Sequence, residues 1–125
     1  MSFLGAAPLK KATKDKYSLT DKGTMLEKIR GTIAREVEKA GLELVEVILF
    51  GSRARGDFRE DSDWDILVVV KGPLDRKKYR ELWRAIYERL DIPADIVIAS
   101  EAEFERLKDA KGYIYYYAAR EGIEI

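Results

Sequence analysis

Two short β-branched segments joined by a polar stretch constrain the fold of this chain more than any other feature. Residues 44–50 (LVEVILF) run directly into Gly51, and residues 64–70 (WDILVVV) follow the polar stretch. Both have the length and composition of β-strands, and the second is apolar at successive positions, as in a strand that is buried on both faces. A third segment of this kind, residues 94–100 (ADIVIAS), lies further along the chain. The sequence therefore predicts a sheet of at least three strands.

Apolar residues at helical spacing fill the segments around these strands. Thr24 and Glu27 form a capping-box pattern that predicts the start of a helix, and Gly41 suits its end. Ser100 and Glu103 form a second capping box. Helices are therefore predicted over residues 24–40, 73–90, 101–107 and 113–120. The order α-β-β-α-β-α-α predicts an α/β (α+β) fold in which helices flank a small mixed sheet.

Aromatic residues gather in two of the predicted helices. Tyr79 and Trp83 belong to the apolar stripe of the helix over residues 73–90, and we expect them and the nearby Tyr87 in the core rather than on a base-stacking surface. The run YIYYY at residues 113–117 has too many rings to bury on one helical face. Some of these rings should be exposed, or should contact a second copy of the chain in a homodimer or a different protein.

Composition limits the chemistry that is available. The chain has 125 residues with no cysteine and no histidine, which excludes disulfides, thiolate nucleophiles and imidazole ligands or bases. Any reaction must use carboxylates, hydroxyls, backbone amides, Lys or Arg, and any metal should be a hard cation with oxygen ligands. Lys plus Arg and Asp plus Glu number 23 each, so the net charge gives no reason to predict direct binding to nucleic acid.

The chain divides into an arm and one domain. Residues 1–23 carry five Lys against two Asp, and we expect a basic arm that is either disordered or docked on a partner or on the domain itself. Residues 24–125 form the domain. Its longest strongly apolar run, Ile66–Val70, is far shorter than the roughly 20 residues that span a bilayer, and the N-terminus has no signal-peptide pattern. We therefore expect a cytoplasmic protein that does not insert into membranes.

Three aspartates are the candidate metal ligands and catalytic acids. Asp63 and Asp65 are two positions apart at the start of the second strand, so their side chains point to the same side with Cα atoms about 6.5 Å apart. Asp95 interrupts the apolar alternation of the third strand, and pairing of that strand with the second would bring it to the same patch. Asp91 is a weaker candidate because it precedes Pro93, outside the strand. Clustered carboxylates repel one another unless a divalent cation neutralises them, and Mg²⁺ or Mn²⁺ suits such oxygen ligands.

The candidate phosphate site is the turn at the end of the first strand. Gly51 allows a backbone conformation that other residues do not adopt, or allows a ligand to approach the backbone closely. If a helix begins after it, free backbone N–H groups and the Ser52 hydroxyl would face a bound phosphate. Arg53 and Arg55 add positive charge, and they either bind the phosphate or form surface ion pairs with nearby acids such as Asp57.

The spacing of these residues resembles a known superfamily. Gly51-Ser52, then ten residues, then Asp63-Trp64-Asp65 and a later acid on a strand are similar to the nucleotidyltransferases related to DNA polymerase beta. The GSRARG and SDWDILVVV segments most resemble the minimal nucleotidyltransferases (MNT proteins), which are often encoded beside helical HEPN proteins and form toxin–antitoxin pairs with them. The resemblance covers residues 24–125.

The resemblance implies a role for each motif. Gly51 and Ser52 would hold the triphosphate of ATP. Asp63 and Asp65 would bind two Mg²⁺ ions, and Asp95 would be the third acid, placed to help activate the attacking hydroxyl. That hydroxyl would attack the α-phosphorus, so that AMP is transferred and pyrophosphate leaves. In the family's antitoxins, the acceptor is a tyrosine of the HEPN toxin, which the modification silences.

Two other functions remain open at this point. One is a non-catalytic antitoxin that binds nucleotide or metal and neutralises its partner by contact. The other is a nucleotidyltransferase that acts on a small molecule. The chain lacks the additional helical domain of larger relatives that modify antibiotics, which favours an acceptor site completed by another protein. Three repelling carboxylates favour catalysis over contact, because a contact surface does not require them.

Overall fold

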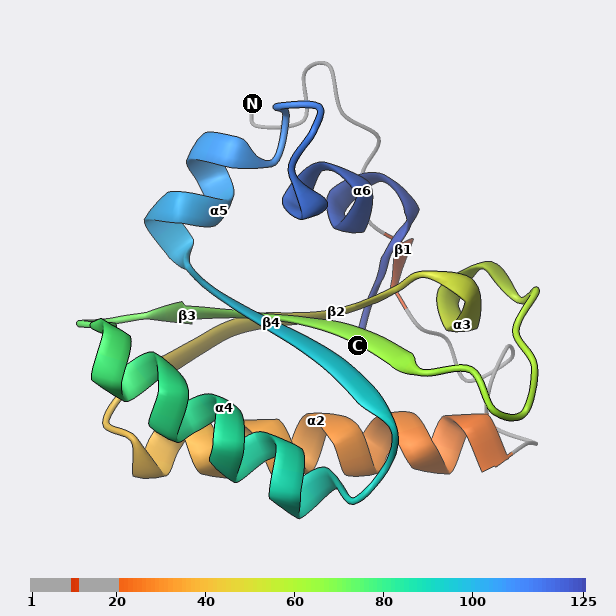
Figure 1. Ribbon diagram of the computed structural model, residues 1–125, viewed down its shortest axis with the longest axis horizontal. Helices are drawn as coiled ribbons and strands as arrows, with labels where there is room; N and C mark the ends of the chain where they lie inside the picture. The colour runs from red at the N-terminus through yellow and green to blue at the C-terminus, as the bar shows by residue number, and fades with distance from the viewer. Residues whose placement is uncertain (1–9, 12–20) are drawn as a thin grey trace.

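The computed structural model describes residues 10–11 and 21–125. Its centre is a five-stranded mixed sheet with the strand order β1-β5-β2-β3-β4, which lies between two layers of helices (Figure 1). The strands are β1 (Lys10–Lys11), β2 (Glu43–Phe50), β3 (Trp64–Lys71), β4 (Ala94–Ser100) and β5 (Ile123–Glu124). The three predicted strands and the mixed sheet are confirmed. The short strands β1 and β5 were not predicted, because two residues carry no periodicity.

Pairing follows from the connections between the strands. β2 pairs antiparallel with β3 and with β5, whereas β3 pairs parallel with β4 and β1 pairs parallel with β5. A parallel neighbour requires a crossover, and a helix supplies it between β3 and β4. β3 therefore lies between β2 and β4 and is buried at every residue from Ile66 to Val70, as the sequence predicted.

Five helices flank the sheet in the described part of the chain. They are α2 (Asp21–Lys39), α3 (Ser52–Arg55), α4 (Arg76–Leu90), α5 (Glu101–Leu107) and α6 (Ile114–Glu121). α2 and α4 cover one face, and α5 and α6 cover the other (Figure 1). The predicted cap at Ser100 is confirmed, since its Oγ accepts the Glu103 N–H at 3.1 Å. The predicted cap at Thr24 was wrong: α2 begins at Asp21 and Thr24 lies inside it, because a cap stabilises by only about 1 kcal/mol and does not prevent a further turn.

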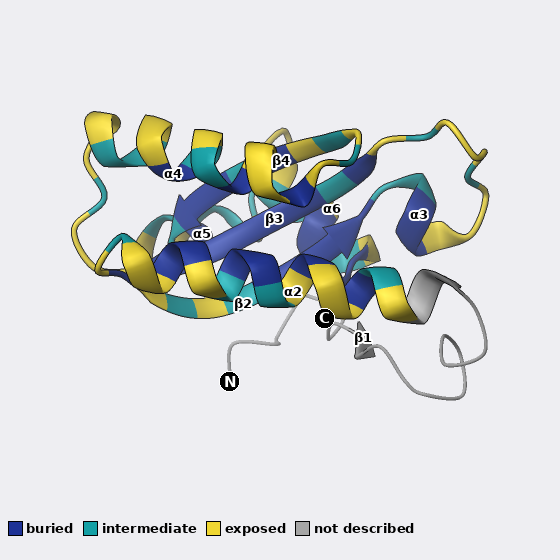
Figure 2. Ribbon diagram, turned by 90° about the horizontal axis from the view of Figure 1, so that it is seen from below, coloured by how far each residue is buried: buried dark blue, intermediate teal, exposed yellow. Residues whose placement is uncertain are grey.

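The alternation of side chains along β3 separates two hydrophobic cores. Ile66, Val68 and Val70 pack with buried residues of α2 and α4, whereas Leu67 and Val69 pack with buried residues of α5 and α6. In Figure 2, α2 and α4 are buried on the side that faces the sheet and exposed on the outer side. Any polar residue on β3 is therefore assigned to one of these two faces by its position in the alternation.

The aromatic residues are only partly placed as the sequence predicted. Tyr79 and Trp83 pack against the core, as expected, but Tyr87 is 44% exposed and its assignment to the core was wrong. It lies past the edge of the apolar stripe, one turn beyond Trp83. In the YIYYY segment, Tyr113 and Tyr117 are exposed, which confirms that this helix cannot bury all of its rings.

The predicted basic arm, residues 1–23, lies mostly outside the described residues. Within it, Lys10 and Lys11 form β1, and their register partners are Ile123 and Glu124. Among the residues that the structure describes, no helix is long and apolar enough to cross a membrane.

Candidate active site

The three predicted acids gather at one end of the sheet. In the parallel β3–β4 pair, Asp65 is the register partner of Asp95, and paired strands lie about 4.8 Å apart. Asp63 immediately precedes β3 and is exposed, as is Asp95, whereas Asp65 is partly buried. Asp65 belongs to the same face of β3 as Leu67 and Val69, the face that α5 and α6 cover further along. The prediction that β4 brings Asp95 beside the Asp63–Asp65 pair is confirmed.

Gly51 lies directly against Asp65. β2 ends at Phe50, whose register partner on β3 is Asp65, so the chain turns immediately beside that carboxylate. Gly51 has φ 72° and ψ −159°, a conformation that is essentially open only to glycine. A Cβ at this position would overlap Asp65 Oδ2 and would lie 2.9 Å from Asp65 Cγ. Both the backbone conformation and the close approach therefore require glycine. The sequence predicted the conformation, whereas the group that approaches closely is the Asp65 side chain, and the approach that the sequence predicted was that of a ligand.

The turn after Gly51 begins a single helical turn, α3, as the sequence predicted. The N–H groups of Ala54 and Arg55 donate to the Gly51 carbonyl at 3.1 and 3.0 Å. The preceding N–H groups, those of Ser52 and Arg53, have no acceptor within the helix, because the first amides of a helical turn never do. The turn therefore begins beside the Asp65 carboxylate with backbone donors that have no acceptor within the helix, and Ser52 is its first residue. Backbone donors of this kind suit a phosphate group.

The acids influence one another electrostatically. The pKa of Asp65 is raised above its usual value, first by burial, then by the negative charge of Asp95 and then by that of Asp63. The positive charge of Arg55 acts in the opposite direction. Without a counterion, burial and the neighbouring acids disfavour the ionised form of Asp65 in the folded protein. A cation bound among these acids would stabilise that form.

The donor chemistry of this cluster fits a hard divalent cation, although the protein does not supply a closed cage. Among the described residues, no group of three or more acidic side chains stands so that it could hold a metal ion by itself. Mg²⁺ typically binds proteins through one or two carboxylates and completes its octahedron with water and substrate phosphates. Asp63, Asp65 and Asp95, beside a turn that suits phosphate, match that pattern of shared coordination.

Among the residues described, Arg53 neither points to a phosphate site nor forms a surface ion pair, the two roles that the sequence predicted as alternatives. It is buried, and its guanidinium lies between the rings of Phe58 and Trp64, at 4.5 and 4.4 Å from their centroids. Nη2 donates to the carbonyls of Glu60 and Ser62 at 3.0 Å each, and Nε donates to that of Ser62 at 3.3 Å. Arg53 therefore fixes the loop between α3 and β3, and the structure assigns it to that loop rather than to a phosphate.

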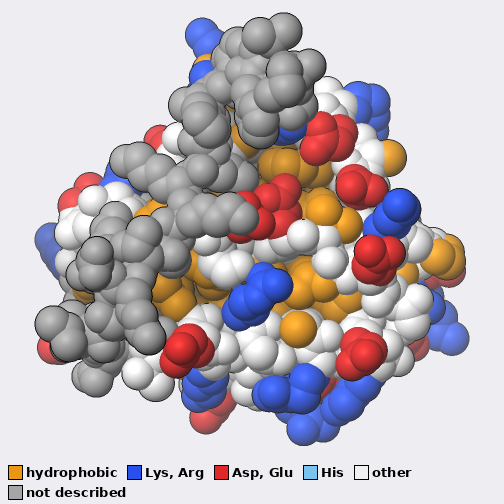
Figure 3. Space-filling model, turned by 180° about the vertical axis from the view of Figure 1, so that it is seen from behind, with side chains coloured by type: hydrophobic (Ala, Val, Ile, Leu, Met, Phe, Trp, Pro, Cys, Tyr) orange, Lys and Arg blue, Asp and Glu red, His pale blue; other side chains and the backbone are white. Residues whose placement is uncertain are grey.

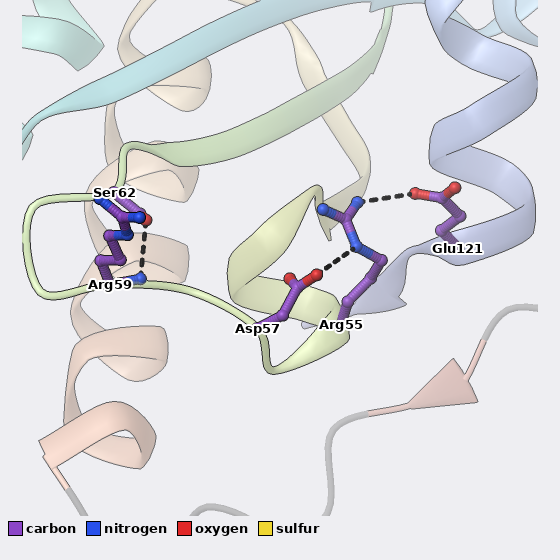
Figure 4. A network of polar contacts seen from close by, with 5 residues as sticks. All are labelled: Arg55, Asp57, Arg59, Ser62 and Glu121. Atoms are coloured by element: carbon purple, nitrogen blue, oxygen red, sulfur yellow. Dashed lines mark hydrogen bonds and ion pairs between the residues drawn. The ribbon is translucent and has the colours of Figure 1, made fainter.

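Arg55 forms the surface ion pair that the sequence left open as an alternative. Its Nε lies 3.4 Å from Asp57 Oδ2, and its Nη1 lies 3.3 Å from Glu121 Oε1 at the end of α6 (Figure 4). In the same loop, the N–H of Arg59 donates to Ser62 Oγ at 2.9 Å (Figure 4). Arg55 is exposed, so its guanidinium remains within reach of solvent and of an incoming ligand.

Sequence reasoning missed one residue that shapes this site, Glu121, and the role of another, Arg53. Glu121 is 66 positions from Arg55 along the chain, and no local pattern could have connected them. The function of Arg53 as a clamp had a weak signal, namely that Phe58 and Trp64 flank an otherwise polar loop. Aromatic rings on both sides of an arginine are a recurrent cation–π arrangement.

These observations favour a protein that binds a nucleotide together with a metal ion. A glycine turn with backbone donors faces strand carboxylates on a mixed sheet, and this combination suits a nucleotide whose phosphates share a metal with the protein. The chain belongs to the nucleotidyltransferase domain family, whose model matches residues 26–119. That span contains Gly51, Ser52 and all three aspartates of the cluster.

Two curated relatives come from Methanocaldococcus jannaschii, and both carry provisional names as protein adenylyltransferases. One is 42% identical over 57 residues, which are 46% of this chain and 57% of the relative. The other is 36% identical over 61 residues, which are 49% of this chain and 59% of the relative. The chain thus spans somewhat more than half of the length of the curated relatives that it matches.

Two solved structures are similar to this chain. A provisionally named nucleotidyltransferase from Sulfolobus solfataricus is 30% identical, with 68% of this chain and 81% of that chain covered and a TM-score of 0.44. A mutant of the toxin–antitoxin pair MntA-HpeT is 22% identical, with 75% of this chain and 69% of that chain covered and a TM-score of 0.51. The second match shows a shared fold.

Proposed function

We propose that this protein transfers AMP from Mg-ATP to a hydroxyl group of a protein acceptor. The observation that carries the proposal is the position of Asp65, which lies against Gly51 on one side and in register with Asp95 on the other. A phosphate held by the turn at Gly51 and Ser52 would therefore lie next to two carboxylates. The provisional names of the curated relatives, as protein adenylyltransferases, support the same reaction.

Each residue has a defined part in the proposed reaction. Gly51 and Ser52 bind the triphosphate through backbone N–H groups and the serine hydroxyl. Asp63, Asp65 and Asp95 would hold two Mg²⁺ ions together with the phosphates of ATP, and the ions would neutralise charge on the entering and leaving oxygens. Asp95, on the exposed side of the pair, accepts the proton of the attacking hydroxyl. A new P–O bond forms at the α-phosphorus, the bond to the β-phosphate breaks, and pyrophosphate leaves.

The proposed acceptor is a tyrosine of a HEPN-domain toxin, and the protein is then the antitoxin of the pair. The fold shared with the MntA-HpeT toxin–antitoxin pair supports a partner of this kind, as does the similarity of GSRARG and SDWDILVVV to minimal nucleotidyltransferases. Tyr113, at the N-cap of α6, and Ile114 and Tyr117 within α6 are exposed, and this surface suits contact with another protein.

The experiment that tests this function follows a labelled α-phosphate. The protein is incubated with α-labelled ATP, Mg²⁺ and the product of its neighbouring gene, and the label is followed into protein on a gel. We expect label on the partner, lost in Asp65→Asn and retained in Asp109→Asn, a matched control at an exposed site outside the cluster. Ser52→Ala should weaken ATP binding in a separate titration.

Two outcomes would redirect the proposal. If Asp65→Asn still neutralises the toxicity of the partner in cells, contact rather than AMP transfer is the mechanism, and the bound nucleotide has a structural or regulatory role. If ATP binds but no protein is labelled, the result favours either the non-catalytic binding module or a different acceptor. A screen for labelled small molecules in a cell extract distinguishes the two.

A further inference from the structure

The charge of the molecule is unevenly distributed, although its total is zero. The helix α4 carries six Lys or Arg against two Glu within 15 residues, so that it alone holds a net charge of +4. On the face shown in Figure 3, by contrast, basic and acidic side chains are interspersed. Because the net charge of the whole chain is zero, the rest of the chain must be acidic. A local basic region of this kind attracts polyanions whatever the net charge of the protein.

The basic side chains of α4 lie exposed at the surface, except that of Lys78, which donates to the Ala40 carbonyl at 2.9 Å. Lys77, Arg80 and Arg84 are exposed and, together with Glu81, line a surface hollow of about 310 Å³. Within the described part of the chain, none of these three cations takes part in an ion pair. Their charge is therefore available to a ligand instead of being neutralised by the protein.

A stacked aromatic pair lies on the same helix. The rings of Trp83 and Tyr87 are 5.0 Å apart and nearly parallel, at 7°. Trp83 Nε1–H donates to the Ile96 carbonyl of β4 at 3.0 Å, which fixes its ring to the sheet. Tyr87 stacks outside it and is 44% exposed. Trp83 and Tyr87 thus form a fixed stacked pair, called here the aromatic step, in which the outer ring, that of Tyr87, is accessible to solvent.

The cations and the aromatic step share one face of α4. Residues three, four and seven positions apart are neighbours on a helix, and Arg80, Trp83, Arg84 and Tyr87 have this spacing. The exposed residues of α4 lie on its outer side (Figure 2), and Trp83 joins this face to β4 on the α2–α4 side of the sheet, whereas Asp65 belongs to the α5–α6 side. This face is therefore separate from the nucleotidyltransferase site.

We propose that this face of α4 binds single-stranded nucleic acid. Arg80, Arg84 and Lys77 contact phosphates, and the exposed ring of Tyr87 stacks on a base. A positively charged track beside an accessible aromatic ring is the usual composition of surfaces that bind single strands without strong sequence preference. An acidic protein would be attracted by the charge alone and would make no use of a stacked ring.

The test measures binding of fluorescent oligonucleotides of about 12 residues, oligouridine and oligothymidine, by anisotropy with the full chain and without ATP. Arg80→Gln/Arg84→Gln should weaken binding and lower the slope of log K against log salt by about 1.4, at about 0.7 per phosphate contact. Tyr87→Ala should weaken binding roughly 5- to 100-fold, and Tyr87→Phe should bind as the parent chain does. Comparison of the two oligonucleotides distinguishes RNA from DNA as the ligand.

A matched control removes the same charge from the opposite side of the sheet. Arg106→Gln/Lys111→Gln replaces two exposed cations on α5 and in the loop that follows it, and should leave binding within about twofold. The proposal is overturned if this control weakens binding as much as Arg80→Gln/Arg84→Gln, or if Tyr87→Ala has no effect. It is also overturned if polyglutamate competes as well as the oligonucleotide, which would reassign the face to an acidic protein. Asp65→Asn should bind oligonucleotide normally, so failure of the proposed AMP transfer would not be mistaken for failure here.

Discussion

Gly51→Ala should destabilise the protein by about 2–4 kcal/mol. The backbone at φ 72° and ψ −159° costs a residue with a Cβ about 1–3 kcal/mol. The new Cβ would also overlap the carboxylate of Asp65, whose Cγ would be only 2.9 Å away. Moving that side chain out of its rotamer adds about 0.5–1.5 kcal/mol. Because the displaced carboxylate is a candidate metal ligand, AMP transfer should be lost as well.

The two parts of this cost can be separated. In an Asp65→Ala background, the overlapping oxygens are absent, so Gly51→Ala should cost about 0.5–1.5 kcal/mol less than in the parent chain. Gly56→Ala is the control for the backbone alone. Gly56 has φ 95°, and a Cβ there would meet no atom within 4 Å, so only the left-handed conformation is penalised, by about 1–2 kcal/mol.

Urea unfolding, followed by far-UV circular dichroism in the absence of Mg²⁺ and nucleotide, gives all four free energies of the cycle. A loss of 3 kcal/mol would lower the melting temperature by roughly 10 °C in a domain of this size. The reasoning is refuted if the two substitutions are additive to within about 0.5 kcal/mol, since the contact between residues 51 and 65 would then carry no energy.

Three further outcomes follow from the same site. Arg53→Ala should lower the free energy of unfolding by about 2–4 kcal/mol, because the carbonyls of Glu60 and Ser62 lose a buried donor. Arg53→Lys should recover less than half of this loss, and chemical denaturation can measure both values. Arg55→Gln should leave stability within experimental error, since its ion pairs are exposed; a large drop in melting temperature would contradict this. The raised pKa of Asp65 means that, without metal, the native state binds its proton more tightly than the unfolded chain. Stability should therefore rise as pH falls through the folded-state pKa of this group toward 3.8, and Asp65→Asn should remove that part of the pH dependence; parallel curves for the two proteins would exclude it.

The sequence predicted those features that depend on local pattern. Period-two and helical spacing gave the three principal strands and the helices that flank them, and the Gly-Ser turn followed by two aspartates indicated the site. β4 pairs beside β3 because the crossover through α4 favours a parallel neighbour, so even the long-range position of Asp95 could be predicted from chain order.

The features that the sequence could not predict depend on tertiary contacts. In the sequence, Arg53 cannot be distinguished from an ordinary surface cation. Its environment is set only in the folded loop, where Phe58 and Trp64 lie against its guanidinium. The pairing of Arg55 with Glu121 depends on where α6 ends, and the exposure of Tyr87 depends on how α4 is rotated against the sheet. In each case, the residue type is compatible with several environments, and only the packed structure selects one of them.

The register between Asp65 and Asp95 has a consequence for the order in which the protein gains its function. The Gly-Ser turn and the first two acids come together in an antiparallel pair of neighbouring strands, which is a local event. The third acid arrives only after α4 has formed and β4 has docked in parallel, a contact of long sequence separation that closes slowly. Under the proposed mechanism, a chain folded only as far as Gly72 would contain both motifs but would lack the third acid. Its activity would begin only when β4 docks beside β3.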